Sequence, residues 1–230
     1  MRGITKGIAL ALGLAAAPAL ILTAAPVLGA PGAAAPEVAA QQSAVPDLDT
    51  LLQHLARPAP ATTPFVEVHF SPLLSRPLIV SGELQYGGPD SLARTVEKPY
   101  SEHTEIHGDE VSVVRGSGKP RTFSLQRSPE LKTLLTSFSA LLGGNRQQLE
   151  SSFTLAVGGD DTHWSLQLTP RDSRVSQRVA HITVSGEAAS PRCMITTAPD
   201  GSVTIMLMEE AARTPLAPDI DRAGLEKVCR

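Results

Sequence analysis

The sequence is poor in aromatic residues and has no excess of positive charge. Its 230 residues include five Phe, two Tyr and one Trp, and the formal net charge is −3 at pH 7. Domains that bind nucleic acids usually carry a basic patch with aromatic side chains among the cations. Anionic lipid headgroups also attract clusters of Lys and Arg. The composition therefore argues against a nucleic acid partner and against a surface that adheres to acidic membranes.

Known catalytic motifs are absent from the sequence as well. It contains no Gly-x-Ser-x-Gly and no His-Glu-x-x-His, and RGSGKP at residues 115–120 lacks the first Gly and the Ser or Thr of a phosphate loop. His103, Glu105 and His107 alternate along one strand, but such neighbours lie about 7 Å apart, too far to share a metal ion. We therefore expect no enzymatic activity, no cofactor and no metal.

The N-terminal region lacks charge over a long stretch. Arg2 and Lys6 precede residues 7–35, which contain no charged residue and consist mostly of Ala, Leu, Gly and Pro. A basic start followed by an apolar stretch is typical of a secretory signal peptide. A membrane anchor is the alternative, although prolines within the stretch disfavour a spanning helix.

The exported chain is expected to begin after cleavage near Ala40. The small residues before Gln41 suit a signal cleavage site, whereas cuts further upstream would leave Pro directly after the cut. This divides the chain into a signal peptide at residues 1–40 and a single domain at residues 41–230. Its 190 residues (230 less 40) suit one hydrophobic core.

The chain has two cysteines, Cys193 and Cys229, whose spacing fits no zinc pattern. Because export leads to an oxidising compartment, a disulfide is the favoured interpretation, with two buried free thiols as the alternative. The bridge would tie the C-terminus to the rest of the fold. It would stabilise the protein by about 3 to 4 kcal/mol in the chain-entropy model.

Alternating apolar residues predict β-strands. In the stretch RPLIVSGELQYGGPD, the residues Leu78, Val80, Leu84 and Tyr86 share one strand face, and the Gly-Gly-Pro-Asp end is a turn. Since strands follow one another without βαβ alternation, the sheet is expected to be antiparallel. Further strands are expected from Phe65 to Phe70, Ser91 to Glu97, Glu102 to His107, Glu110 to Arg115 and Arg121 to Gln126, around residues 153–157, 164–168 and 182–184, and in a hairpin from Cys193 to Met208.

Helical spacing of apolar residues predicts three helices. They lie at Pro46 to Arg57, at Ser128 to Leu142, and near Asp219 to Val228. The apolar stripe of the second helix is expected to cover a curved sheet together with the first helix. Its polar stripe, which includes Ser137 and Ser139, is expected to face water.

Several of these segments carry a family resemblance. In order they are FVEVHFS, PLIVSGELQY with its Pro turn and LARTVEKP, IHGDEVSVV, the second helix, and HWSLQLTP. Together they cover Asp47 to Glu187, and this part of the chain resembles the LolA-like periplasmic outer-membrane lipoprotein carriers, most closely a divergent LolA-related group. The resemblance implies a mainly β fold with α-helices, an antiparallel unclosed β-barrel (half-barrel) covered by a helical lid. The arginine that the main family has before its turn proline is Gly88 here, which leaves Arg94 as the candidate contact for the lid.

The resemblance also implies a function. A periplasmic carrier of this kind shields the acyl chains of a lipoprotein or other lipid in an apolar cavity on the way to the outer membrane. The implied partners are a lipid or lipidated protein cargo, an inner-membrane transporter that releases it and an outer-membrane receptor, and we expect a monomer. A non-catalytic scaffold or sensor domain that binds a protein is the alternative, and a lipid hydrolase is a further one. The residues expected to line the cavity are Phe70, Leu78, Val80, Leu84, Tyr86, Leu131, Leu134, Leu135, Phe138, Leu155, Trp164, Leu166, Ile182 and Val184.

Overall fold

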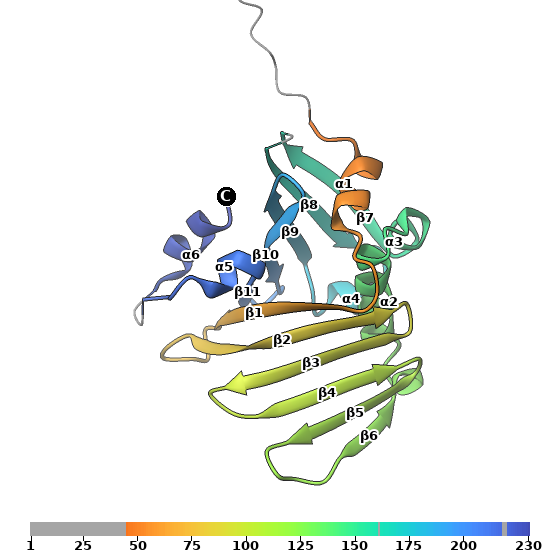
Figure 1. The fold of residues 1–230 in the computed structure, drawn as a ribbon, viewed down its shortest axis with the longest axis vertical. Helices are drawn as coiled ribbons and strands as arrows, with labels where there is room; N and C mark the ends of the chain where they lie inside the picture. Colours follow the sequence, from red (N-terminus) through yellow and green to blue (C-terminus); the bar gives the residue numbers. More distant parts are fainter. Residues whose placement is uncertain (1–44, 161, 218–219) are drawn as a thin grey trace, which may run out of the picture. The chain divides into compact units, whose positions relative to one another are not determined.

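Eleven antiparallel strands form one sheet that does not close on itself (Figure 1). The structure is a computed structural model that describes residues 45–160, 162–217 and 220–230. Within these residues the strand order is β6-β5-β4-β3-β2-β1-β11-β10-β9-β8-β7, so β6 and β7 are the two edges. The predicted antiparallel half-barrel is therefore confirmed. The predicted signal peptide at residues 1–40 lies outside the described residues.

The strands follow the predicted alternation of apolar residues closely. β4 and β5 begin and end at the predicted residues, and the other strands differ from the predicted bounds mainly at their ends. The bounds are β1 Ala61–Phe70, β2 Leu78–Gly88, β3 Ser91–Lys98, β4 Glu102–His107, β5 Glu110–Arg115, β6 Arg121–Ser124, β7 Phe153–Gly159, β8 His163–Pro170, β9 His181–Glu187, β10 Ser190–Thr197 and β11 Val203–Met208.

The three predicted helices are present, and the described residues contain further short ones. Asp or Asn side chains cap α1, α3, α4 and α6 by accepting hydrogen bonds from backbone N–H groups. No helix in this part of the chain combines the length and apolar composition that a membrane crossing requires. The bounds are α1 Leu48–Leu55, the 3-10 helix η1 Leu125–Arg127, α2 Pro129–Leu142, α3 Arg146–Ser152, α4 Ser173–Ser176, α5 Glu209–Arg213 and α6 Arg222–Val228.

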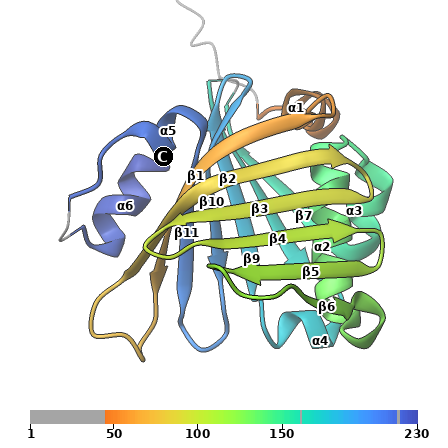
Figure 2. The same cartoon turned by 60° about the horizontal axis from the view of Figure 1, so that its bottom comes forward.

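The concave side of the sheet holds the larger core. The halves β1–β6 and β7–β11 meet at β1 and β11, α1 and α2 lie on the concave side, and α3 lies beside α2 near β7 (Figures 1 and 2). Leu51 and Leu55 of α1, Leu141 of α2 and Leu149 of α3 are buried with Leu166 of β8 in one apolar cluster. The first two predicted helices therefore cover the concave face, as expected.

The convex side carries a second core beneath α5 and α6. Val68 of β1 and Ile205 of β11 are buried in it with Leu225 of α6. A disulfide joins Cys193 of β10 to Cys229 at the end of α6, with 5.5 Å between the Cα atoms. The predicted disulfide is present, and it ties the C-terminus to the sheet.

The prediction that the polar stripe of α2 faces water is wrong for two residues. Ser137 and Ser139 are 3% and 7% exposed. Ser137 faces the space between α2 and strands β7–β10, and the short helices α3 and α4, which sequence periodicity did not predict, also contact α2. The Ser137 hydroxyl donates to the Thr133 carbonyl at 2.7 Å, and a hydroxyl paired within its own helix tolerates burial. Helix α2 therefore lies between the sheet and two short helices.

Candidate functional site

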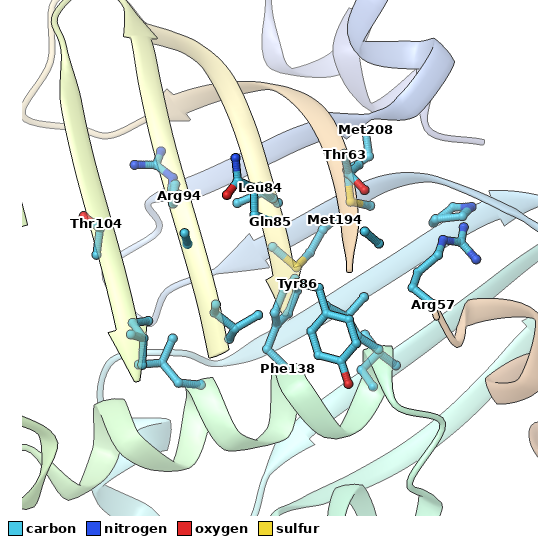
Figure 3. Close-up of a pocket in the computed structure, with 18 of the residues that line it drawn as sticks. Arg57, Thr63, Leu84, Gln85, Tyr86, Arg94, Thr104, Phe138, Met194 and Met208 are labelled. Carbon is cyan, nitrogen blue, oxygen red and sulfur yellow. The ribbon is translucent and has the colours of Figure 1, made fainter. Parts of the chain in front are cut away.

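A mostly apolar cavity of about 310 Å³ lies between α2 and the concave face of the sheet (Figure 3). We call it the main cavity. This volume is near the lower end of the roughly 300 to 1,000 Å³ that is usual for small-molecule sites. It is lined by Leu55, Arg57, Ala61, Thr63, Leu84, Gln85, Tyr86, Leu92, Ala93, Arg94, Thr104, Ile106, Val111, Val113, Phe123, Leu131, Leu135, Phe138, Leu141, Leu142, Val184, Pro191, Met194, Met208 and Glu209.

The strand register explains why so many apolar side chains meet there. Tyr86 pairs with Leu92, Leu92 with Ile106, Ile106 with Val111, and Val111 with Phe123. Directly opposite residues on one face of an antiparallel sheet have Cβ atoms about 5 Å apart. These five side chains therefore form a continuous apolar row across β2–β6. The apolar stripe of α2 lines the same cavity.

A second cavity of about 220 Å³ lies beside the main cavity, between α2 and β7–β10. Leu135, Phe138, Leu141, Val184 and Met194 line both cavities, so side chains alone separate them. Figure 3 shows Phe138 rising from α2 toward the strands. Side chains can change rotamer, so a rotamer change of Phe138 or Met194 would connect the two cavities without movement of the backbone.

Eight of the fourteen residues predicted to line a lipid cavity lie in the walls of these two spaces. They come from β2, α2 and β9, the segments with the clearest periodicity. They are Leu84, Tyr86, Leu131, Leu134, Leu135, Phe138, Ile182 and Val184.

Five of the other six predicted residues lie in packed regions or on other surfaces. Val80 and Leu166 are 1% and 0% exposed in the concave core, and Leu155 packs against the same core. Phe70 lies on the convex face with the cluster under α6, because even-numbered residues of β1 point to that side. Leu78, at the start of β2, is 39% exposed.

The sixth residue, Trp164, packs on the sheet itself. A Cβ atom added to Gly186 would lie 2.2 Å from the indole ring, so a glycine is required at that position. The indole N–H donates to the Ala188 carbonyl at 2.7 Å. The ring is therefore held against β9, where it fills space in the core and lines neither the main nor the second cavity.

A charged group lies in the wall of the main cavity. The Arg94 guanidinium is 3.1 Å from Glu67 Oε1 and 4.9 Å from the centre of the Phe65 ring. His69 Nε2 is 2.5 Å from the same Glu67 oxygen. In the structure Arg94 bonds within the sheet, and its role as a contact for the lid stays a prediction.

The residue Glu67 is only 7% exposed, so its neighbours determine the pKa of its carboxyl group. Burial raises the pKa of Glu67, but the His69 hydrogen bond and the positive charge of Arg94 outweigh this, so the pKa lies below its ordinary range. A carboxyl group whose pKa is lowered by folding stabilises the protein above its unfolded pKa. This contribution is lost as the pH falls through the folded pKa.

We therefore predict that the free energy of unfolding falls below about pH 5 more steeply in the unmutated protein than in Glu67→Gln. Urea denaturation at several pH values measures this slope. Glu83→Gln, which removes an exposed carboxylate from the neighbouring strand, is the matched control and should keep the steep slope. Equal slopes for Glu67→Gln and the unmutated protein would contradict the prediction.

A second ion pair lies at another part of the main cavity wall. Arg57 Nη2, just after α1, is 2.8 Å from Glu209 Oε1 at the start of α5. Glu209 has a φ of 52°, in the left-handed region that costs a non-glycine residue about 1 to 2 kcal/mol. Both arginines in the wall therefore have an acidic partner, and neither presents an uncompensated charge to the cavity.

The N-terminal end of α2 is fixed to the sheet by an exposed contact. Lys132 Nζ is 2.6 Å from Asp109 Oδ1 in the β4–β5 turn, and Gln126 donates to Asp109 Oδ2 at 3.2 Å. The hydrogen bond from Lys132 lowers the pKa of Asp109. Water and salt screen ion pairs at the surface, so this pair holds this end of α2 only weakly.

The described residues contain no group of three or more His, Cys, Asp or Glu side chains that could hold a metal ion. His103 and Glu105 instead lie 3.1 Å apart on the face of β4 opposite Ile106. What the main cavity offers is aliphatic surface with two neutralised ion pairs. This arrangement suits the binding of a flexible apolar molecule.

Sequence reasoning did not assign the residues of β3–β6 to the cavity wall. Leu92, Ile106, Val111, Val113 and Phe123 all line the main cavity. The signal was present, because apolar residues alternate in each of these strands. Alternation identifies the buried face but does not show that the sheet curves far enough to bring β5 and β6 over α2.

Comparison with known proteins identifies the family. A family model described as outer membrane lipoprotein carrier protein LolA-like matches residues 39–230. No curated protein matches the sequence.

Three solved structures with detectable similarity are distant in sequence. A LolA superfamily protein from Nitrosomonas europaea is 11% identical, with 80% of this chain and 97% of that chain covered and a TM-score of 0.38. LprF from Mycobacterium bovis is 11% identical, with 76% and 98% covered and a TM-score of 0.33. A chain of the Pseudomonas aeruginosa MucA/MucB complex is 15% identical, with 80% and 63% covered and a TM-score of 0.33. The assignment rests on the family model, and it confirms the resemblance found in the sequence: the chain belongs to the outer membrane lipoprotein carrier protein LolA-like family.

Proposed function

We propose that the protein is a periplasmic carrier that holds the acyl chains of a lipoprotein or another lipid in the main cavity during transport toward the outer membrane. The observation that supports this proposal is the mostly apolar wall of the cavity, to which α2 and all six strands of the β1–β6 half contribute. Each methylene group that leaves water contributes about 0.8 kcal/mol, so one long acyl chain gains on the order of 10 kcal/mol before the cost of association.

Loading and release would take place beneath α2. The contact between Lys132 and Asp109 is exposed, and its loss would let the N-terminal end of α2 move away from the β4–β5 turn at small cost. We propose that an inner-membrane transporter loads the cargo and an outer-membrane receptor receives it, each by displacing this helix. The carrier would act as a monomer and without covalent chemistry.

Export is part of the same proposal. Residues 1–40 would be removed as a signal peptide, and residues 41–230 would fold in the periplasm as one lipid-carrier domain. The mature chain would begin at Gln41.

Native mass spectrometry of the protein purified from its own periplasm tests the proposal. We expect a bound acyl species on a chain that begins at Gln41. In Thr104→Phe, a bulky ring enters the main cavity, and the amount of bound lipid should fall. Thr122→Phe places the same ring on the exposed opposite face of β6 and should leave bound lipid unchanged. Protein without any acyl adduct, together with no binding of added lipid, would favour a scaffold domain instead.

A further inference from the structure

A hollow of about 520 Å³ with basic residues in its wall adjoins the main cavity at the β6 edge of the sheet. It is lined by Arg115, Lys119 and Arg121, and we call it the basic cavity. Val113 and Phe123 belong to its wall and to the wall of the main cavity. The two spaces therefore meet at these two side chains, on the concave side of β5 and β6.

The two cavities differ in how far acidic partners compensate their positive charges, and an anion binds better where the positive charge is uncompensated. In the main cavity, Glu67 and Glu209 compensate the two arginines. In the basic cavity, Arg115 pairs with Glu102, while Lys119 and Arg121 have no ion-pair partner among the described residues. Uncompensated positive charge thus lies beside the apolar space and not inside it.

Phe123 marks the boundary between the two spaces. Its side chain is 43% exposed, whereas its register partner Val111 is 3% exposed. The exposed ring offers apolar surface that an acyl chain would remove from water. A chain that leaves the main cavity toward the basic cavity would lie along this ring.

The sequence segment behind the basic cavity is RGSGKPR, residues 115–121. It is not a phosphate loop, but it brings three cations into one β5–β6 hairpin of a chain whose formal net charge is −3. Binding depends on the local charge more than on the net charge, because exposed charges further apart than about 8 to 10 Å are largely screened at physiological salt. Net acidity therefore does not argue against an anion at this hairpin.

We propose that the basic cavity binds the anionic headgroup, a phosphate or carboxylate, of the lipid whose acyl chain occupies the main cavity. This inference rests on the proposed carrier function and narrows its cargo to acidic lipids or acidic lipid anchors. The planar Arg121 guanidinium can donate two parallel hydrogen bonds to such a group, and Lys119 adds a second positive charge. The bound lipid would therefore pass over Phe123 and Val113, with its chain in the main cavity and its headgroup in the basic cavity.

Calorimetric titration with two lipids that share a palmitoyl chain tests the inference. Lysophosphatidic acid carries a phosphate and monopalmitoylglycerol does not. The unmutated protein should bind the phosphate lipid at least about tenfold more tightly, as expected for hydrogen bonds to a charged group. Lys119→Gln/Arg121→Gln should remove this preference and leave the affinity for the neutral lipid unchanged. The preference should also shrink as salt is added.

Arg174→Gln/Lys227→Gln is the matched control, because it removes the same two charges at exposed positions on α4 and α6 and should retain the preference. Equal affinity for both lipids, or a preference that survives Lys119→Gln/Arg121→Gln, would overturn this inference and leave the carrier function standing. Inorganic phosphate that binds as tightly as lysophosphatidic acid would overturn the link between the two cavities. Failure of both lipids to bind would overturn the carrier function itself.

Discussion

A protein with Cys193→Ala and Cys229→Ala is expected to have a free energy of unfolding about 3 to 4 kcal/mol lower than that of the unmutated protein. The bridge joins residues 36 positions apart, so it removes a large amount of conformational freedom from the unfolded chain. It also fixes α6 over the convex core, where Val68 and Leu225 are completely buried. Urea denaturation followed by circular dichroism measures the loss.

Two controls distinguish the effect of losing the disulfide from the effect of the alanine side chains. Reductant added to the unmutated protein should produce most of the same loss, and reductant added to the double variant should change nothing. Lipid binding should survive in the folded variant, because α6 and the main cavity lie on opposite faces of the sheet. A loss of less than about 1 kcal/mol would mean that the convex core holds α6 without the bridge.

The strands could be predicted because each has a strong local signal. β4 and β5 alternate between apolar and polar residues and are separated by Gly108 and Asp109, so their ends were identified to the residue. Consecutive strands pair as neighbours within each half of the sheet, and the chain therefore requires no distant pairing except that of β1 with β11.

The short helices could not be predicted, and this changed the surroundings of α2. Helix α3 has one apolar residue, Leu149, in the segment RQQLESS, which is too little for a periodic pattern. Leu149 is nevertheless 0% exposed, and α3 packs against α2. Ser137 lines the second cavity, and its burial, like that of Ser139, comes from tertiary packing around α2 that helical periodicity does not predict.

The candidate site was predictable in part for a related reason. Periodicity shows which face of a strand is apolar, but it does not show whether that face meets another side chain or open space. Leu84 and Leu166 occupy equivalent positions in their patterns, yet Leu84 lines the main cavity and Leu166 is buried in the core. Alternation along β1 shows that Phe70 lies on an apolar face of the strand. The sheet has a core on each face, however, and the sequence does not indicate which core Phe70 joins.

Truncating a leucine that lines a cavity should cost less stability than truncating a leucine that is packed in the core. Leu166→Ala and Leu135→Ala remove the same atoms from two leucines on the concave side. Leu166 is 0% exposed and packed on all sides, so its truncation is expected to cost about 2 to 5 kcal/mol through lost burial and the space left behind. Leu135 is half-buried and lines both the main and the second cavity, so part of its surface has no packing partner to lose. Its truncation should cost clearly less than that of Leu166.

Lipid affinity should change in the opposite order. Leu135 would contact the acyl chain in the proposed carrier, so Leu135→Ala should lower the affinity for lipid, measured by displacement of a fluorescent fatty acid. Leu166→Ala should leave this affinity nearly unchanged in the folded protein. Lipid at a free concentration of 100 times its Kd should raise the free energy of unfolding of the unmutated protein by about 2.7 kcal/mol. Thermal melts with and without lipid measure this gain, and Leu135→Ala should show a smaller one. If Leu135→Ala costs as much stability as Leu166→Ala and lipid stabilises neither variant nor the unmutated protein, then α2 closes a filled core, and the concave face has no space in which to carry an acyl chain.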